Sequence, residues 1–157
     1  FADADVVLSA LGLKLPGLAP WAKPEDPTIL TRAGAAIKTA AEKAGVGRVI
    51  VISAGGVGDS YTTMPAFFRG MIRMTALRTA YAELDRFEQA LWSGSFDTIA
   101  VRATGLSDGP KTGEAREATS LVGRAQISRA DVADWMLKHV AGPIENRSPI
   151  VTVTGAG

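Results

Sequence analysis

The clearest hydrophobic pattern lies in the stretch Arg48–Ser60, where residues 49–52 form an unbroken run of β-branched residues. Such a run is typical of a strand buried on both faces, as in the middle of a parallel sheet. It ends abruptly in Ser53-Ala54-Gly55-Gly56. Ligands of open α/β sheets bind just outside the carboxyl ends of the strands, so we place a candidate site here. The alternative is a glycine-rich turn without a ligand.

Two further apolar runs predict buried strands that end in small residues. Residues 6–8 lead into Ser9–Gly12, and residues 98–101 lead into Arg102–Leu106. Between the first run and the next helix, residues 13–27 hold four prolines, which indicates an irregular loop. This loop either covers a site or is a plain surface connection, and Trp21 is its expected anchor.

Helical spacing of apolar positions predicts three helices. The first runs from the cap Thr28 to about Ala44 and stops at Gly45. The second spans 66–92, with a break expected near Gly70. The third follows Ser128, where Asp131 replaces the usual glutamate of a capping box. Its apolar stripe consists of Val132, Trp135, Met136 and Val140.

The remaining segments complete an α/β pattern. Residues 114–127 are expected to form two short strands around Gly123, and Pro149–Thr154 a last strand. Residues 54–63 are expected to be loop. The order β-α-β-α-β-(β-β)-α-β predicts a parallel sheet flanked by helices in a three-layer sandwich. With 157 residues, the chain is expected to form one domain over residues 1–157.

The segment Met64–Met74 is unusually apolar, with two phenylalanines, an isoleucine and three methionines. One interpretation is a stripe that faces the core. The other is an exposed apolar wall of a substrate pocket or a dimer face.

Composition narrows the function classes. The net charge is +1, from 17 basic and 16 acidic residues, which gives no electrostatic case for nucleic acid or an anionic membrane. The chain has no cysteine and one histidine, His139, so no metal site is expected. It has no run of about 18 apolar residues that would span a membrane. A cytoplasmic location is expected, with a small-molecule substrate as partner and a homodimer left open.

Four segments in this order resemble the atypical short-chain dehydrogenases/reductases. They are VVLSALG, GRVIVISAGG, TIAVRATGLSDGPKTG and ISRADVADWML. The group most similar is the NAD(P)H-binding one, which includes NmrA-like and flavin reductase/biliverdin reductase B-like proteins. The resemblance covers essentially the whole chain and implies a Rossmann-type fold with NADP or NAD lying across the strand ends.

The resemblance also implies site residues. Ser9, Ala10, Leu11 and Gly12 match the loop beside the ribose and pyrophosphate of the cofactor. Ser53 and Ala54 match the strand exit near the nicotinamide, and Ser53 is the candidate catalytic residue. Arg102, Ala103 and Thr104 match the segment that closes over the nicotinamide end. The segment with Ser128, Arg129 and Asp131 matches one with a mainly structural role.

Two family features are absent. No Gly-x-x-Gly-x-x-Gly follows a first strand. By the order of the matched segments, the phosphate-binding half, roughly 60 residues or more in two βαβ units, is expected upstream of Phe1. The Tyr-x-x-x-Lys pair is also missing, because Tyr81 is followed four residues later by Asp85. A serine hydrolase is disfavoured, since no glycine lies two residues before Ser53.

Three functions remain open. The first is an NAD(P)H-dependent reductase that transfers hydride to a flavin, quinone or carbonyl compound. The second is a non-catalytic NAD(P)-binding sensor or interaction protein of the same fold. The third is a truncated module that binds no dinucleotide.

Overall fold

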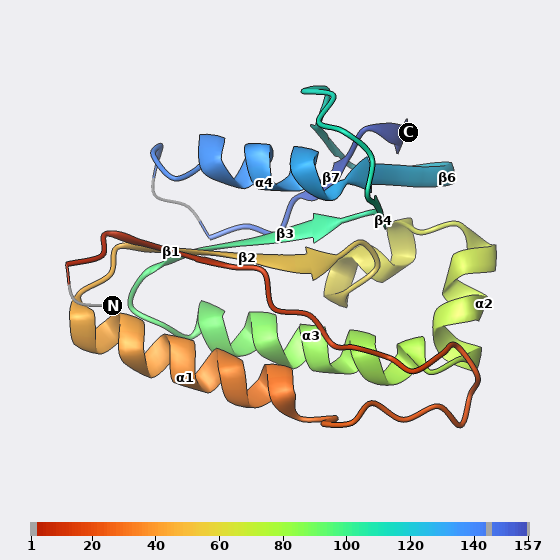
Figure 1. Ribbon diagram of the computed structural model, residues 1–157, viewed down its shortest axis with the longest axis horizontal. Helices are drawn as coiled ribbons and strands as arrows, with labels where there is room; N and C mark the ends of the chain where they lie inside the picture. The colour runs from red at the N-terminus through yellow and green to blue at the C-terminus, as the bar shows by residue number, and fades with distance from the viewer. Residues whose placement is uncertain (1–2, 144–145, 157) are drawn as a thin grey trace.

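A five-stranded sheet forms the centre of the protein in the computed structural model, which describes residues 3–143 and 146–156 (Figure 1). The strand order is β1-β2-β3-β7-β5, and all neighbours are parallel except β5 and β7. The strands are β1 (Val6–Ser9), β2 (Arg48–Ala54), β3 (Asp97–Ala103), β5 (Arg116–Ala118) and β7 (Ile150–Thr152). The predicted Rossmann-like α/β fold is therefore confirmed.

Helices cover both faces of this sheet (Figure 1). α1 (Ile29–Ala44) and α3 (Leu77–Trp92) lie on one face, and α4 (Arg129–Lys138) lies on the other. The two faces hold separate hydrophobic cores. Val51, Phe87 and Leu91 belong to the core under α1 and α3, whereas Ile50 and Trp135 belong to the core under α4. Within the described residues, no helix is both long and apolar enough to cross a membrane.

The first helix begins and ends as predicted. Thr28 occupies the N-cap position of α1, although its hydroxyl donates to Asp26 and caps no helical N–H. Gly45 ends the helix with φ +69°, a left-handed conformation that glycine adopts without steric cost.

The predicted break at Gly70 is wrong, because Gly70 lies inside α2 (Ala66–Met74). The chain turns instead at Thr75, which is extended between α2 and α3. The Thr75 hydroxyl donates to the Met71 carbonyl at 2.8 Å and accepts from the Leu77 amide at 3.2 Å. One β-branched side chain thus ends one helix and begins the next.

The apolar segment Met64–Met74 is partly buried and partly exposed, so the core-facing and the exposed interpretation each hold for some of its residues. Ile72 is buried, whereas Phe67 and Met74 are exposed. Trp21, expected as an anchor, is 81% exposed and does not pack the proline-rich loop down.

Three other expectations need correction. The loop after β2 contains a 3-10 helix, η1 (Gly58–Thr63). Gly123 lies inside β6 (Leu121–Ser128) rather than between two strands. The last strand divides into β7 and β8 (Thr154–Ala156), because β8 joins a separate sheet of order β4-β6-β8, in which β4 is Gly105–Ser107.

The cap of α4 is confirmed. The Ser128 hydroxyl accepts from the Asp131 amide at 2.9 Å. The Asp131 carboxylate accepts from the Ser128 hydroxyl at 2.8 Å and also from the amides of Thr112 and Gly113. It thereby ties the turn after β4 to α4.

Candidate functional site

The ends of three parallel strands bring the predicted segments to one edge of the sheet. Ser53 lies opposite Arg102 and Ala54 opposite Ala103 in the β2–β3 register. On the other side, Ser9 lies opposite Val51 in β2. The strands run in the same direction, so their exits meet at one edge. The binding roles assigned to these segments stay predictions.

Ser9 and Ser53 face the same side of the sheet. Residues opposite each other on adjacent strands share a face of the sheet, and so do residues two apart on one strand. Ser9 lies opposite Val51, and Ser53 follows Val51 by two residues, so both serines share the face of Val51. Val51 packs in the core under α1 and α3. Ser9 is 8% exposed and Ser53 4%, and neither hydroxyl has a hydrogen-bond partner among the described residues. Buried hydroxyls are nearly always paired, which marks these two as candidate ligand contacts.

Hydrogen bonds fix the loop that follows Ser53. The Gly55 amide donates to the Ala103 carbonyl at 2.9 Å, and the Tyr81 hydroxyl donates to the Gly55 carbonyl at 3.1 Å. The Gly56 amide donates to the Ser60 hydroxyl at 2.9 Å. The loop is therefore held in place before any ligand arrives.

Gly56 could not be another residue without strain. Its φ is +99°, and an added Cβ would lie 3.1 Å from the Tyr81 ring and 3.2 Å from Met64. The close approach of the loop to α3 thus depends on this glycine.

Arg102 is in the predicted place, but its side chain is already engaged. The guanidinium is buried and binds the carboxylate of Glu88 on α3 at 2.8 Å, and it also pairs with Asp59 of η1. Burial alone lowers the pKa of Arg102, but the two carboxylates more than offset it and leave the pKa raised. The bond from Arg102 likewise lowers the pKa of Asp59. These contacts favour a positioning role, because Arg102 fastens η1 and α3 to the end of β3.

The other predicted residues differ in accessibility. Thr104 is buried, and its hydroxyl is bonded to that of Thr152 at 3.0 Å. Ala10, Leu11 and Gly12 are exposed, and nothing lies within 4 Å of the position that a Cβ on Gly12 would take. The backbone of residues 10–12 is therefore open to a ligand.

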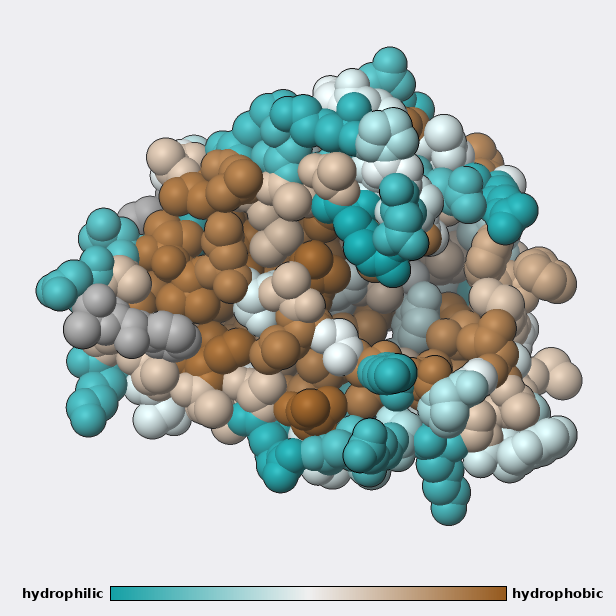
Figure 2. Space-filling view, viewed as in Figure 1, coloured by the Kyte–Doolittle hydropathy of each residue, from teal (hydrophilic) through white to brown (hydrophobic). Residues whose placement is uncertain are grey.

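An apolar pocket of about 460 Å³ opens beside residues 9–12 on the face that carries α4. Its lining includes Leu8, Leu11, Leu106 and Leu137, each more than 40% exposed. Figure 2 shows apolar side chains gathered on this side of the molecule, over β1 and α4.

Tyr81 is not placed for proton transfer. The Tyr81 hydroxyl is committed to the Gly55 carbonyl, and burial raises its pKa. Asp85, in the place of the expected lysine, accepts from the Gln89 amide at 2.8 Å. Tyr81 therefore holds the loop and is not an acid or base of the classical pair.

Sequence reasoning missed the Arg102–Glu88 pair and the contact of Tyr81 with Gly55. Glu88 did carry a signal, because it is a charged residue inside the apolar stripe of Leu84, Phe87 and Leu91. A carboxylate at such a position needs a buried cation.

A nicotinamide dinucleotide is compatible with the residues present at this edge. Ser9 and Ser53 offer unpaired hydroxyls, and the open backbone of residues 10–12 allows close approach. The phosphate-binding glycine motif does not occur in the sequence.

Comparisons with known proteins agree with this geometry. Residues 1–143 match a family model described as NAD(P)H-binding. A structure of chuY from Escherichia coli CFT073 is similar, with 26% identity, TM-score 0.65, and 77% of this chain and 64% of that chain covered. ChuY from E. coli O157:H7, an anaerobilin reductase, has 22% identity and TM-score 0.73 over 96% and 64% of the two chains.

A third structure is a short-chain dehydrogenase/reductase from Veillonella parvula in complex with NADP. It has 18% identity and TM-score 0.69 over 95% and 63% of the two chains. This chain thus spans slightly less than two thirds of the length of these proteins. A search of curated proteins found no match. The match over nearly the whole sequence shows that the chain belongs to the NAD(P)H-binding family, whose cofactor is a nicotinamide dinucleotide.

Proposed function

We propose that this chain forms the nicotinamide side of an NAD(P)H-dependent reductase of the atypical, NmrA-like short-chain dehydrogenase/reductase type. Its substrate class is a small organic acceptor, namely a flavin, quinone or carbonyl compound. The observation that carries the proposal is the pair of buried, unpartnered hydroxyls of Ser9 and Ser53 at adjacent strand ends. The similarity to an anaerobilin reductase supports reductive chemistry.

Each part of the edge has a role in this proposal. The hydroxyl of Ser53 binds the cofactor carboxamide or the substrate, and that of Ser9 binds the ribose side. The backbone of residues 10–12 lies along the cofactor, and the loop at Gly55, held by Tyr81, fixes the position of Ser53. A bound nicotinamide cofactor supplies the hydride, while the protein supplies orientation.

Two features support a further strand and helix beside β1, which the expected upstream segment would supply. β1 pairs only with β2 among the described strands, so its other edge is open. The apolar pocket beside Leu8 and Leu137 flanks that edge. A further strand and helix would pair with the edge and cover the pocket, because open strand edges and large apolar patches are normally covered.

One observation favours a second candidate, a non-catalytic NAD(P)-binding sensor or interaction protein. The Tyr81 hydroxyl is engaged with Gly55, and no lysine accompanies it. The site then lacks the side-chain acid of classical members, and it would bind the cofactor without turnover.

Titration of the full-length protein with NADPH and NADH, followed by cofactor fluorescence, tests binding. We expect saturable binding that weakens about two- to tenfold in Ser53→Ala, because one hydrogen bond is lost. Ser95→Ala is the control, since Ser95 is exposed and lies two residues before β3, at the end of the strand that is opposite to the candidate site. Absence of binding to either nucleotide contradicts the proposal and favours the third candidate, a truncated module. A Gly-x-x-Gly-x-x-Gly encoded upstream of Phe1 would contradict that third candidate.

Oxidation of NADPH at 340 nm with flavins, quinones and carbonyl compounds separates the first two candidates. Turnover of any acceptor at enzyme-like rates supports the reductase, and binding without turnover across the panel supports the sensor. The cytoplasmic location and the homodimer stay predictions.

A further inference from the structure

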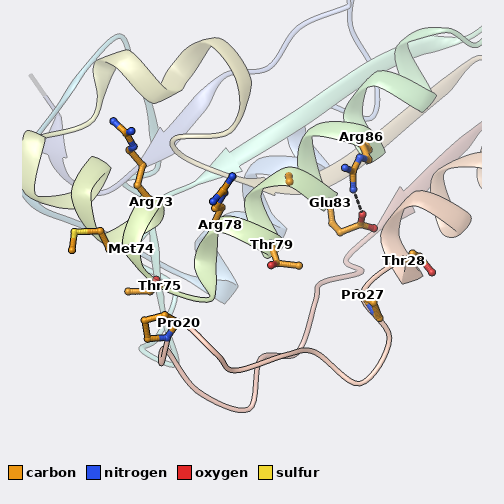
Figure 3. A pocket seen from close by; sticks show the side chains of 11 residues that line it. Pro20, Pro27, Thr28, Arg73, Met74, Thr75, Arg78, Thr79, Glu83 and Arg86 are labelled. Atoms are coloured by element: carbon orange, nitrogen blue, oxygen red, sulfur yellow. Dashed lines mark hydrogen bonds and ion pairs between the residues drawn. The ribbon is translucent and has the colours of Figure 1, made fainter.

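A second cleft, of about 650 Å³, lies away from the strand ends. It is bounded by the end of α2, the first turns of α3 and the proline-rich loop (Figure 3). No residue of the segments 9–12, 53–54 or 102–104 lines it. Three arginines line the cleft: Arg73, Arg78 and Arg86.

Arg86 and Glu83 neutralise each other in this cleft. The Glu83 carboxylate accepts from Arg86 at 2.7 Å and from the amide and hydroxyl of Thr31 at 3.2 and 2.9 Å. Burial alone raises the pKa of Glu83, but these bonds more than offset it and leave the pKa below its usual value. Glu83 is thus ionised and fully engaged, so it leaves no charge to balance the other arginines.

The guanidinium groups of Arg73 and Arg78 have no ion pair or hydrogen bond with any described residue, and both side chains are exposed. Figure 3 shows the two on neighbouring helices, extending in the same direction. Arg73 also lines a smaller hollow of about 300 Å³ with Arg69, one helical turn away. Like charges at this spacing repel. The first turn of α3 carries no acidic residue, so the positive end of the helix adds to the same field.

The cleft also offers apolar surface. Pro20 and Met74 line it, and the Met74 side chain is 74% exposed. The cleft therefore combines Arg73 and Arg78 with the apolar side chains of Met74 and Pro20.

We propose that this cleft binds an organic dianion, whose two anionic groups pair with Arg73 and Arg78 and whose apolar body lies on Met74 and Pro20. Guanidinium groups pair with both carboxylates and phosphates, so either supplies the anionic group. The site is separate from the cofactor edge and does not rest on the proposed reductase activity.

Isothermal titration calorimetry on the full-length protein tests the proposal with three probes. Dodecanedioate has an apolar body and two carboxylates, its dimethyl ester has the body without charge, and inorganic pyrophosphate has charge without the body. We expect the dioate to bind, the ester not to bind, and the dioate affinity to fall with salt. Weaker binding of pyrophosphate than of the dioate supports the contact of an apolar body with Met74 and Pro20. Equally tight binding would show that the body contributes nothing and would overturn that part of the proposal.

Variants locate the binding. Arg73→Gln and Arg78→Gln are each expected to weaken the dioate at least about tenfold, because each removes a charge-assisted bond. Both variants are expected to keep the melting temperature, since neither side chain is buried or paired. Arg124→Gln is the matched control, because Arg124 is exposed on β6 and its loss should change affinity less than about twofold.

Three results would overturn the proposal. They are no heat with the dioate or pyrophosphate, equal binding of dioate and ester, and variants of Arg73 and Arg78 that bind like the Arg124 control. Displacement of the dioate by saturating NADPH, or loss of dioate binding in Ser53→Ala, would place the anion at the strand ends. Either result would also overturn the proposal. A protein that binds the dioate but not NADPH keeps this proposal and contradicts the proposed function.

Discussion

The hydroxyls of Ser9 and Ser53 lie on the same face of the sheet, at the ends of neighbouring parallel strands, and both are buried without a partner among the described residues. An unpaired buried hydroxyl is unfavourable in a folded protein, and the two at adjacent strand exits are the basis of the binding roles that we propose for them. Both lie where α/β sheets bind their ligands.

Removing either hydroxyl should not destabilise the cofactor-free protein. Ser9→Ala and Ser53→Ala each remove a buried polar group that has no partner among the described residues, so we expect stability to be unchanged or to rise by up to about 1 kcal/mol. Urea unfolding without nucleotide measures this. A loss of more than about 1 kcal/mol would mean that the hydroxyl is structural and would count against its role in binding.

Replacing only one member of the buried Arg102–Glu88 ion pair should strongly destabilise the protein. Arg102→Met removes the guanidinium that pairs with the buried Glu88 carboxylate, which costs about 3–5 kcal/mol. The double variant Arg102→Met/Glu88→Met should recover much of this loss. Arg129→Met is the control, because Arg129 pairs with Asp108 at the exposed surface, where a pair is worth at most about 1 kcal/mol. Urea midpoints that are equal for Arg102→Met and the control would contradict the structural role.

Gly56→Ala should destabilise the loop after Ser53. The added Cβ meets the Tyr81 ring at 3.1 Å on a backbone with φ +99°, so we expect a loss of more than about 1 kcal/mol and weaker cofactor binding. Gly12→Ala is the matched control, because its Cβ meets nothing within 4 Å. Thermal unfolding of both variants measures the difference, and an unaffected Gly56→Ala would show that the loop tolerates a shift.

Tyr81→Phe should affect the position of the loop at Gly55 and should not affect proton transfer. The variant loses the bond to the Gly55 carbonyl and with it about 0.5–1.5 kcal/mol of stability. The raised pKa of Tyr81 keeps the phenol protonated at neutral pH, so the pH profile of any turnover should keep its shape between about pH 6 and 9. A limb of the profile that disappears in Tyr81→Phe would instead identify Tyr81 as an acid or base.

Asp131 should make stability depend on pH at the acid end. Burial alone raises its pKa, but bonds from Gly113, Ser128 and Thr112 more than offset it and leave the pKa below the usual 3.8. The stabilisation is complete above the unfolded value of about 3.8 and is lost as the pH falls through the lower folded value. Asp131→Asn should therefore be less stable at neutral pH, and the difference should shrink below about pH 4. Urea unfolding of both proteins from about pH 7 to 2.5 measures it, and a constant difference would contradict the pKa shift.

The sequence by itself determined the fold class and the location of the candidate edge. Continuous β-branched runs identify strands buried on both faces, and the residues after each run must meet at one edge when the strands are parallel. The end of α1 at Gly45 and the start of α4 at Ser128 could also be predicted from the sequence, because helix caps depend on local backbone geometry.

Only the tertiary structure decided which side chains remain unpaired. Ser53 and Arg102 looked equivalent as strand-end residues, yet Glu88 on the preceding helix, α3, engages Arg102, and no described residue engages the Ser53 hydroxyl. The partner of Tyr81 likewise depends on how α3 packs against the loop after β2. The periodicity of apolar residues predicts strands and helices, whereas the pairing of polar groups depends on contacts between different elements of the fold, which local sequence patterns do not reveal.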